Sequence, residues 1–242
     1  MTNLVVGASG ATGRLLVAQL LDRGQSVGVI VRAPDSLPEA IRHHERLTVI
    51  HASVLDLRDD ELAQHVKGCT AVASCLGHTL NLNGIYGHPR RLVTEATIRL
   101  CNAVKTNESN TTTKFVLMNT AGNSNRDLHE PISFGQRCVI GLVRLLLPPH
   151  VDNERAADHL RTGIGQDDKS LEWAVVRPDT LIDEDQVTEY EVHPSPTRSA
   201  IFNAGRSSRI NVAHFMADLI TTSNIWDRWK GKMPVIYNKV LS

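Results

Sequence analysis

The chain has 242 residues, of which 41% are hydrophobic, and this is enough to form one large buried core. Lysine plus arginine equals aspartate plus glutamate, at 26 each, so the composition indicates no basic surface for nucleic acid or for an anionic membrane. We therefore expect a single domain over residues 1–242 whose partner is a small-molecule substrate, with no nucleic acid and no membrane as partner, in a monomer or a homodimer.

Apolar, β-branched runs alternate with segments of helical period along most of the chain. The predicted strands are residues 3–7, 26–32, 47–52, 70–77, 113–121, 171–178 and 233–238. The predicted helices are residues 12–23, 36–43, 59–67, 88–107, 137–147, 153–163 and 211–223. Such a pattern predicts an α/β fold, a Rossmann-like doubly wound parallel sheet of about seven strands with a small C-terminal substrate-side lobe.

Two segments interrupt the alternation, at about 122–152 and 179–210. Each follows a late strand. In open parallel sheets the loops beyond the carboxyl ends of the strands form the ligand crevice. We therefore predict that both segments are insertions on the substrate side.

The sequence GASGATGR, residues 7–14, joins the first strand to the first helix. In a dinucleotide site the first glycine permits the tight turn, the second lets the pyrophosphate approach the backbone, and the third lets helix and strand pack closely. Gly7, Gly10 and Gly13 fit these roles. The pyrophosphate is expected at the N-terminus of helix 12–23, where Ser9 and Thr12 add hydroxyl donors next to Ala11.

The spacing Gly-x-x-Gly-x-x-Gly, with GASGATGR, resembles the atypical short-chain dehydrogenase/reductase family, in particular its NmrA-like and biliverdin-IXβ/flavin-reductase-like branch. The resemblance covers nearly the whole chain. It includes VKGCTAVASCLG before and along the fourth strand, TKFVLMNTAGN at the fifth, NERAADHLR and LEWAVVRPDTLID around the sixth, and SSRINVAHFMADLI near the end. It implies an NAD(P)H-binding protein.

The second strand ends in a cation, which favours NADP(H) over NAD(H). A ribose 2′-hydroxyl is usually held by an acidic residue at this point, whereas a 2′-phosphate needs a positive charge. Arg32 stands there, Arg14 follows the last glycine, and Asp35 lies beyond the expected contact point.

Further cofactor contacts are implied by the resemblance. At the third strand, relatives place a Gly-Asp pair whose carboxylate meets the adenine amino group, and this chain has Ala52-Ser53 followed by Val54. A serine hydroxyl also accepts a hydrogen bond, so Ser53 is expected to replace that aspartate, while Asp56 is expected to cap helix 59–67. The other contacts are expected from the ends of strands four to six, at Cys75, Leu76, Gly77, Asn119, Thr120, Arg177 and Pro178.

The wider family transfers hydride with a Tyr-x-x-x-Lys pair, in which lysine lowers the tyrosine pKa. Tyr86, Tyr190 and Tyr237 have no lysine four residues later, and Glu154 lies near the expected lysine position. This argues against the sugar epimerases and dehydratases of the extended family. The resemblance implies electron-poor acceptors that take a proton from water or a weak acid.

Two residues are the catalytic candidates. Thr120 matches a serine that the resembling reductases place beside the nicotinamide, although backbone groups could equally satisfy its hydroxyl. His150 precedes the helix that normally carries the tyrosine and could act as an acid or a substrate contact. Arg177 either shapes the nicotinamide end of the site or pairs with a nearby acid.

The remaining signals concern compartment and metals. Cys69, Cys75, Cys101 and Cys138 form no Cys-x-x-Cys motif, which is typical of reduced thiols in a cytoplasmic protein. No signal peptide, membrane span or metal-ligand spacing is predicted.

These observations predict an NADPH-dependent oxidoreductase that reduces a flavin-, quinone- or conjugated-carbonyl-type small molecule. The alternative is a non-enzymatic redox sensor of NmrA type that binds NADP(H) as a signal.

Overall fold

The computed structural model describes residues 2–78, 81, 85–107, 111–128, 130 and 133–239. Positions 129 and 131–132 of the predicted insertion 122–152 therefore lie outside the described residues. The main sheet has eight strands in the order β3-β2-β1-β4-β5-β6-β10-β8. Seven of these strands run parallel, and β8 closes the edge antiparallel to β10. The doubly wound Rossmann-like α/β fold is confirmed.

The seven predicted strands form at or near the predicted residues. They are β1 (Thr2–Val6), β2 (Ser26–Val31), β3 (Leu47–His51), β4 (Cys69–Ser74), β5 (Thr113–Met118), β6 (Leu171–Pro178) and β10 (Val235–Asn238). Three short strands are additional: β7 (Thr180–Ile182) pairs with β9 (Arg206–Ser208) in a separate two-stranded sheet, and β8 (Tyr190–His193) joins the main sheet.

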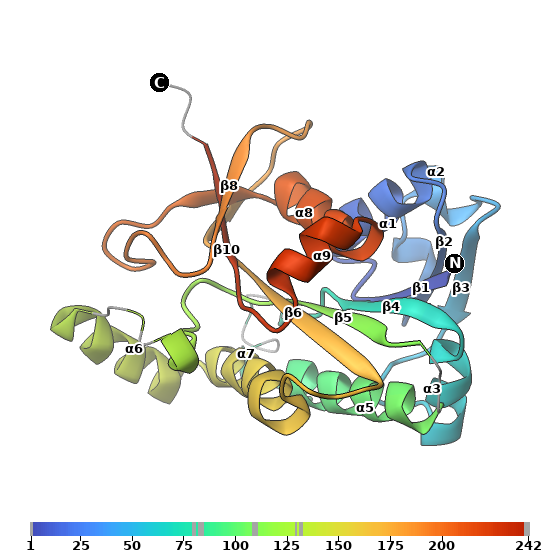
Figure 1. Cartoon of the computed structure of the whole chain (residues 1–242), viewed down its shortest axis with the longest axis horizontal. Helices are drawn as coiled ribbons and strands as arrows, with labels where there is room; N and C mark the ends of the chain where they lie inside the picture. Colours follow the sequence, from blue (N-terminus) through green and yellow to red (C-terminus); the bar gives the residue numbers. More distant parts are fainter. Residues whose placement is uncertain are drawn as a thin grey trace.

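The helices cover both faces of the main sheet (Figure 1). One face carries α1 (Ala11–Asp22), α2 (Glu39–Arg42), α8 (Arg209–Thr221) and α9 (Ser223–Trp229), whose apolar residues share one core cluster. The short η1 (Pro34–Ser36) precedes α2 and has no buried residue. The other face carries α3 (Asp59–Val66), α5 (Leu92–Thr106) and α7 (Pro148–Asp158), which share the second. The sheet therefore separates two apolar layers, and this is why its central strands are apolar on both sides.

Several helix boundaries differ from the expectation. The helix predicted over residues 36–43 divides into η1 and α2 because Pro38 lies between them. The helix predicted from residue 153 begins at Pro148 and continues into the π-type turn η3 (His159–Ile164). Asp56 does not cap α3: the cap position is Arg58, whose backbone amide donates to Glu61.

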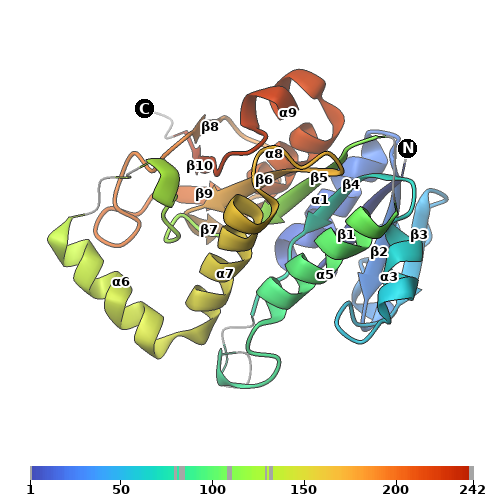
Figure 2. The same cartoon turned by 60° about the horizontal axis from the view of Figure 1, so that its bottom comes forward.

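Two further elements lie in the first insertion, the short η2 (Arg126–Leu128) and α6 (Phe134–Leu146). Figure 2 shows α6 projecting from the body and meeting α7 like the second arm of a V. Only Ile140 of α6 is buried, and apolar side chains such as Phe134 and Leu145 are largely exposed. No helix among the described residues is both long enough and apolar enough to span a bilayer.

Candidate functional site: a dinucleotide crevice

The glycine turn lies where the strand order reverses, between β1 and its neighbours β2 and β4. Gly7 has φ +75°, and a Cβ there would stand 2.5 Å from the backbone carbon of Cys75. A Cβ at Gly13 would be 2.1 Å from the Gly7 oxygen. Both glycines are thus required by the packing of strand and helix, as the motif predicts.

Gly10 differs from the other two glycines. Its φ of −72° suits any residue, it is exposed, and a Cβ would lie 3.2 Å from the Gly7 oxygen and meet nothing else. The fold alone therefore makes a weak demand for glycine here. A pyrophosphate that approaches the backbone at this turn would leave no room for a side chain, which fits the expected contact.

The N-terminus of α1 has the features of an anion-binding site. No side chain caps it, and its first turn carries no acidic residue, so backbone N–H groups are left for a ligand. Ser9 and Ala11 are exposed there, whereas Thr12 is buried. Of the two hydroxyls expected to bind phosphate, the one on Ser9 is the more accessible.

Beside the turn lies a cavity of about 360 Å³ between the ends of β1, β2, β3 and β4. It brings together residues that the sequence analysis chose separately: Gly7, Ser9, Arg32, Ser53, Val54 and Leu76. Asp56, His88 and Pro89 also line it, and sequence reasoning missed them as cofactor contacts. Asp56 follows Ser53 by three residues, so the carboxylate absent from the expected position stands one turn further on. The cavity suits the adenosine half of a dinucleotide.

Two arginine side chains near the glycine turn are available to bind an anion. Arg32 and Arg14 are exposed, and neither side chain has an ion pair within the described part of the chain. Asp35, the nearest acid after β2, is bound by Arg42 at 3.0 Å. This end of the crevice therefore presents positive charge that can meet an anionic group of a ligand.

At the opposite end of the crevice, β4 and β5 are followed by small and polar residues. Burial raises the pKa of the Cys75 thiol to about 12, so this residue is a neutral packing group and not a nucleophile. Asn119 is buried and donates to the backbone oxygen of Asn153 at 2.9 Å, which fixes the end of β5 against α7. Gly77 has open space where a Cβ would stand.

Thr120 follows Asn119 at the mouth of the crevice. Its hydroxyl oxygen accepts from the Gly122 amide at 3.2 Å. The hydroxyl hydrogen has no acceptor within the ranges that the structure describes. The backbone thus uses the Thr120 hydroxyl only as an acceptor, and its O–H group remains able to donate to a ligand.

Arg177 pairs with a nearby acid, which is one of the two roles that the sequence leaves open for it. Its side chain is fully buried, and its guanidinium binds Glu130 at 2.6 Å and the carbonyl oxygens of Asn123, Met233 and Pro194. It therefore joins the loop after β5 to the C-terminal strands instead of facing the crevice. Pro178, which follows it, accepts from the Ala121 amide through its backbone oxygen.

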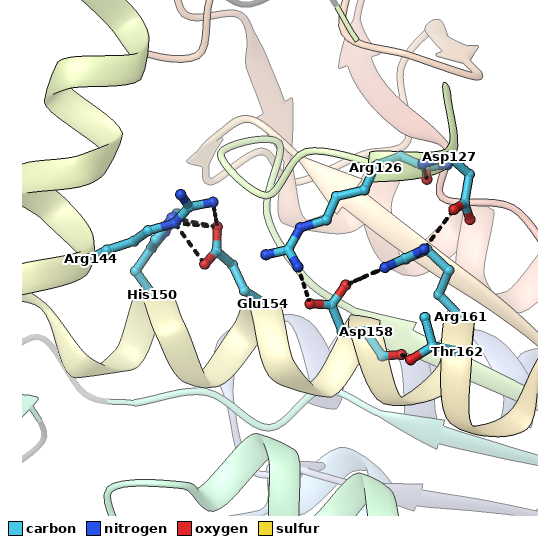
Figure 3. Close-up of polar contacts among 9 residues, drawn as sticks. Arg126, Asp127, Arg144, His150, Glu154, Asp158, Arg161 and Thr162 are labelled. Carbon is cyan, nitrogen blue, oxygen red and sulfur yellow. Dashed lines mark hydrogen bonds and ion pairs between the residues drawn. The ribbon is translucent and has the colours of Figure 1, made fainter. Parts of the chain in front are cut away.

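His150, the other catalytic candidate, lies near Thr120. A Cβ at Gly122 would lie 3.6 Å from both the Thr120 Oγ1 and the His150 Cε1, so the two side chains flank the same glycine. Nε2 of His150 is 3.4 Å from Glu154, which Arg144 of α6 also binds (Figure 3).

The three tyrosines are engaged elsewhere. Tyr86 donates to the carbonyl of Leu146 at the end of α6. Tyr190 bonds to His214 on α8, and Tyr237 packs against Gly205. Within the described ranges, no group of three or more metal-ligating side chains comes together.

The parallel order, the switch point and the glycine turn define a dinucleotide-binding Rossmann protein. A family model described as NAD(P)H-binding matches residues 7–223. The chain therefore belongs to the NAD(P)H-binding, atypical short-chain dehydrogenase/reductase family of oxidoreductases.

Solved structures show the same fold at low identity. The oxidoreductase ylbE from Lactococcus lactis has a TM-score of 0.69 at 17% identity, covering 100% of this chain and 93% of that one. A short-chain dehydrogenase/reductase from Veillonella parvula in complex with NADP has 0.69 at 18%, covering 98% and 94%. A candidate NADH-flavin reductase from Streptococcus pneumoniae has 0.64 at 18%, covering 99% and 100%. No curated protein matches.

Proposed function

We propose that the protein is an NADPH-dependent reductase that transfers hydride to a flavin-, quinone- or conjugated-carbonyl-type small molecule. The observation that carries the cofactor choice is Arg32, which lines the cavity and has no ion pair with any residue that the structure describes. The nearest acid, Asp35, is already bound by Arg42. The similar Veillonella parvula protein was solved with NADP, and the Streptococcus pneumoniae protein is a candidate flavin reductase. The similarity to the first supports NADP(H) as the cofactor, and the similarity to the second, which is named for NADH, supports the flavin-type acceptor alone.

Each end of the crevice has a defined task in this proposal. The cofactor supplies the hydride when bound. The Gly10 backbone and the amides of α1 bind its pyrophosphate, and Arg32 binds the 2′-phosphate. The Thr120 hydroxyl donates a hydrogen bond at the nicotinamide end, where positioning of the acceptor contributes to the rate.

The cofactor choice is tested by fluorescence titration with NADPH and NADH. Arg32→Ala is expected to weaken NADPH binding about tenfold and to leave NADH binding unchanged, because a charge-assisted hydrogen bond contributes roughly 1.5–3 kcal/mol before solvent screening. Arg137→Ala is the matched control, since it removes an exposed cation from α6. Equal affinity of the wild type for both nucleotides would refute the phosphate pocket.

The second candidate is a redox sensor, favoured by the absence of a Tyr-x-x-x-Lys pair. The two functions differ in turnover. A reductase oxidises NADPH above background with at least one acceptor in a panel of flavins, quinones and conjugated carbonyls. A sensor binds both nucleotides and oxidises none.

A further inference from the structure

His150 and Glu154 lie one turn apart in α7 and face the same side of the helix (Figure 3). Nε2 of His150 is buried and makes no hydrogen bond to any described residue. Its distance of 3.4 Å to Oε1 of Glu154 is that of an ion pair and not of a well-formed hydrogen bond. A protonated imidazole would place its charge directly against the carboxylate.

Glu154 is itself held in place from a second helix. Arg144 of α6 binds both of its carboxylate oxygens, at 2.7 and 2.9 Å. Burial would raise the pKa of Glu154, but its contacts with His150 and Arg144 outweigh burial and hold the pKa at about 2. The carboxylate therefore stays charged through the whole physiological range.

The rest of α7 is anchored so that His150 cannot shift easily. Asp152 accepts from the amides of Val93 and Thr94 at the start of α5 and binds His78 at 2.8 Å. The Asn119 side chain binds the backbone of Asn153. The histidine is thus fixed relative to the ends of both β5 and α5.

The other carboxylates on this helix are engaged elsewhere. Asp152 faces α5, and Asp158, one turn beyond Glu154, binds Arg126 at 3.0 Å and Arg161 at 3.2 Å. Glu154 is the partner of His150 in its ion pair among the described residues, and Arg144 binds the same carboxylate.

We infer that His150 is the proton donor of the reductase and that Glu154 is the positioning residue that keeps its imidazole oriented. This inference rests on the proposed function. It also narrows the substrate class to conjugated carbonyls and quinones, whose oxygen must be protonated. A reduced flavin is stable as an anion and needs no such donor.

The step balances with NADPH as the reductant. Hydride brings two electrons to the acceptor carbon, and the carbonyl π electrons move to oxygen, directly or through the conjugated double bond. That oxygen takes the proton from the imidazolium, and Nδ1, the ring nitrogen that does not face Glu154, is the donating atom. Neutral His150 then keeps its Nε2 proton toward Glu154 and regains the other from solvent.

The kinetic test compares His150→Gln and Glu154→Gln with Asp158→Asn, the matched control that removes a neighbouring arginine-paired carboxylate. With a conjugated carbonyl, the first two variants are expected to lose about a hundredfold in kcat with little change in KM. With a flavin they should lose less than threefold. Glu154→Asp should restore part of the rate, because its carboxylate can still orient the imidazole.

A second readout does not depend on turnover. In urea unfolding at pH 6, the effects of His150→Gln and Glu154→Gln should be non-additive by about tenfold in the unfolding equilibrium constant, because the two groups contact each other. His150→Gln and Asp158→Asn should be additive. NADPH affinity should stay within twofold of wild type in every variant.

The outcomes separate the two proposals. An active wild type in which Asp158→Asn loses as much as Glu154→Gln, or in which losses are equal for flavin and carbonyl, overturns the proton-donor assignment alone. Additivity of the first pair overturns the positioning role of Glu154. A wild type that binds NADPH and reduces nothing overturns the proposed function, and the donor role with it.

Discussion

At the scale of single residues, the three glycines of the turn have different reasons to be glycine. Gly7 and Gly13 are demanded by the fold, because a Cβ at either would overlap backbone atoms. Gly10 is demanded by the ligand, because its backbone conformation suits any residue and only one atom stands within 4 Å of a Cβ. A substitution at Gly10 therefore separates binding from folding.

Gly10→Ala is expected to weaken NADPH binding at least tenfold while the thermal midpoint of unfolding changes by less than about 3 °C, since the new methyl group occupies the space of the pyrophosphate. Calorimetry with NADPH and a thermal melt measure the two effects. Gly141→Ala in α6, where a Cβ meets nothing, is the control and should leave binding unchanged. Undiminished binding in Gly10→Ala would show that the turn serves packing alone.

The sequence predicts residues of this crevice where a local motif reports them. Gly7 and Arg32 follow from the ends of the first two strands and Ser53 from the family resemblance, and all three line the cavity. No local motif indicates that Glu130 or Asp56 has a role here. Glu130 binds Arg177, which lies 47 residues further along the chain. Asp56 reaches the cavity because the chain turns after β3.

At the scale of secondary-structure elements, one buried ion pair holds the loop after β5 against β6. Arg177 and Glu130 are almost completely buried, and Glu130 also accepts from the Asn125 amide. Breaking such a pair leaves an uncompensated buried charge. The pair therefore fixes the loop that holds Glu130 against β6.

Glu130→Ala and Arg177→Met are each expected to lower the free energy of unfolding by about 3–5 kcal/mol in urea. The double variant Arg177→Met/Glu130→Leu should recover much of the loss, because no charge is left buried without a partner. NADPH affinity in this double variant should be near that of wild type. Stability regained without affinity would instead assign Arg177 a direct cofactor contact.

The predictability of elements follows their length and their periodicity. The long strands and helices were predicted to within a few residues at most ends because their apolar pattern repeats several times. β7, β8 and β9 have three or four residues each, too few for a period, and β7 exists because it pairs with β9, about 26 residues later. Such pairing is not visible in local sequence.

At the scale of the whole molecule, the sheet order brings distant chain segments to one edge. The glycine turn follows β1, the small residues around Gly77 follow β4, and Thr120 follows β5, and these three strands are neighbours in the sheet. The alternation of strands and helices predicted this layered arrangement. The contact of α6 with α7 through Arg144 and Glu154 was not predicted, since it depends on how two helices meet.

The acid sensitivity of the folded state is a property of the whole molecule. Burial and a nearby lysine lower the pKa of His159, so its contribution to stability is full above its unfolded pKa, about 6.5, and is lost as the pH falls through the folded value. The pKa of Glu154 is lowered from 4.5 to about 2. Its contribution is full above 4.5 and is lost between about pH 4.5 and 2.

Urea unfolding between pH 8 and 3 should therefore show a stability that falls in two stages. Because one pKa unit corresponds to about 1.4 kcal/mol, the charged form of Glu154 contributes at most about 3 kcal/mol above pH 5. Glu154→Gln should be less stable than wild type by up to this amount at pH 7, and the gap should close toward pH 3. His159→Asn should flatten the stage that begins as the pH falls below about 6.5 and leave the slope below pH 4.5 as in wild type. Each variant is therefore the control for the other. A gap between wild type and Glu154→Gln that stays constant with pH would mean that the carboxylate is not held in its charged form by Arg144 and His150.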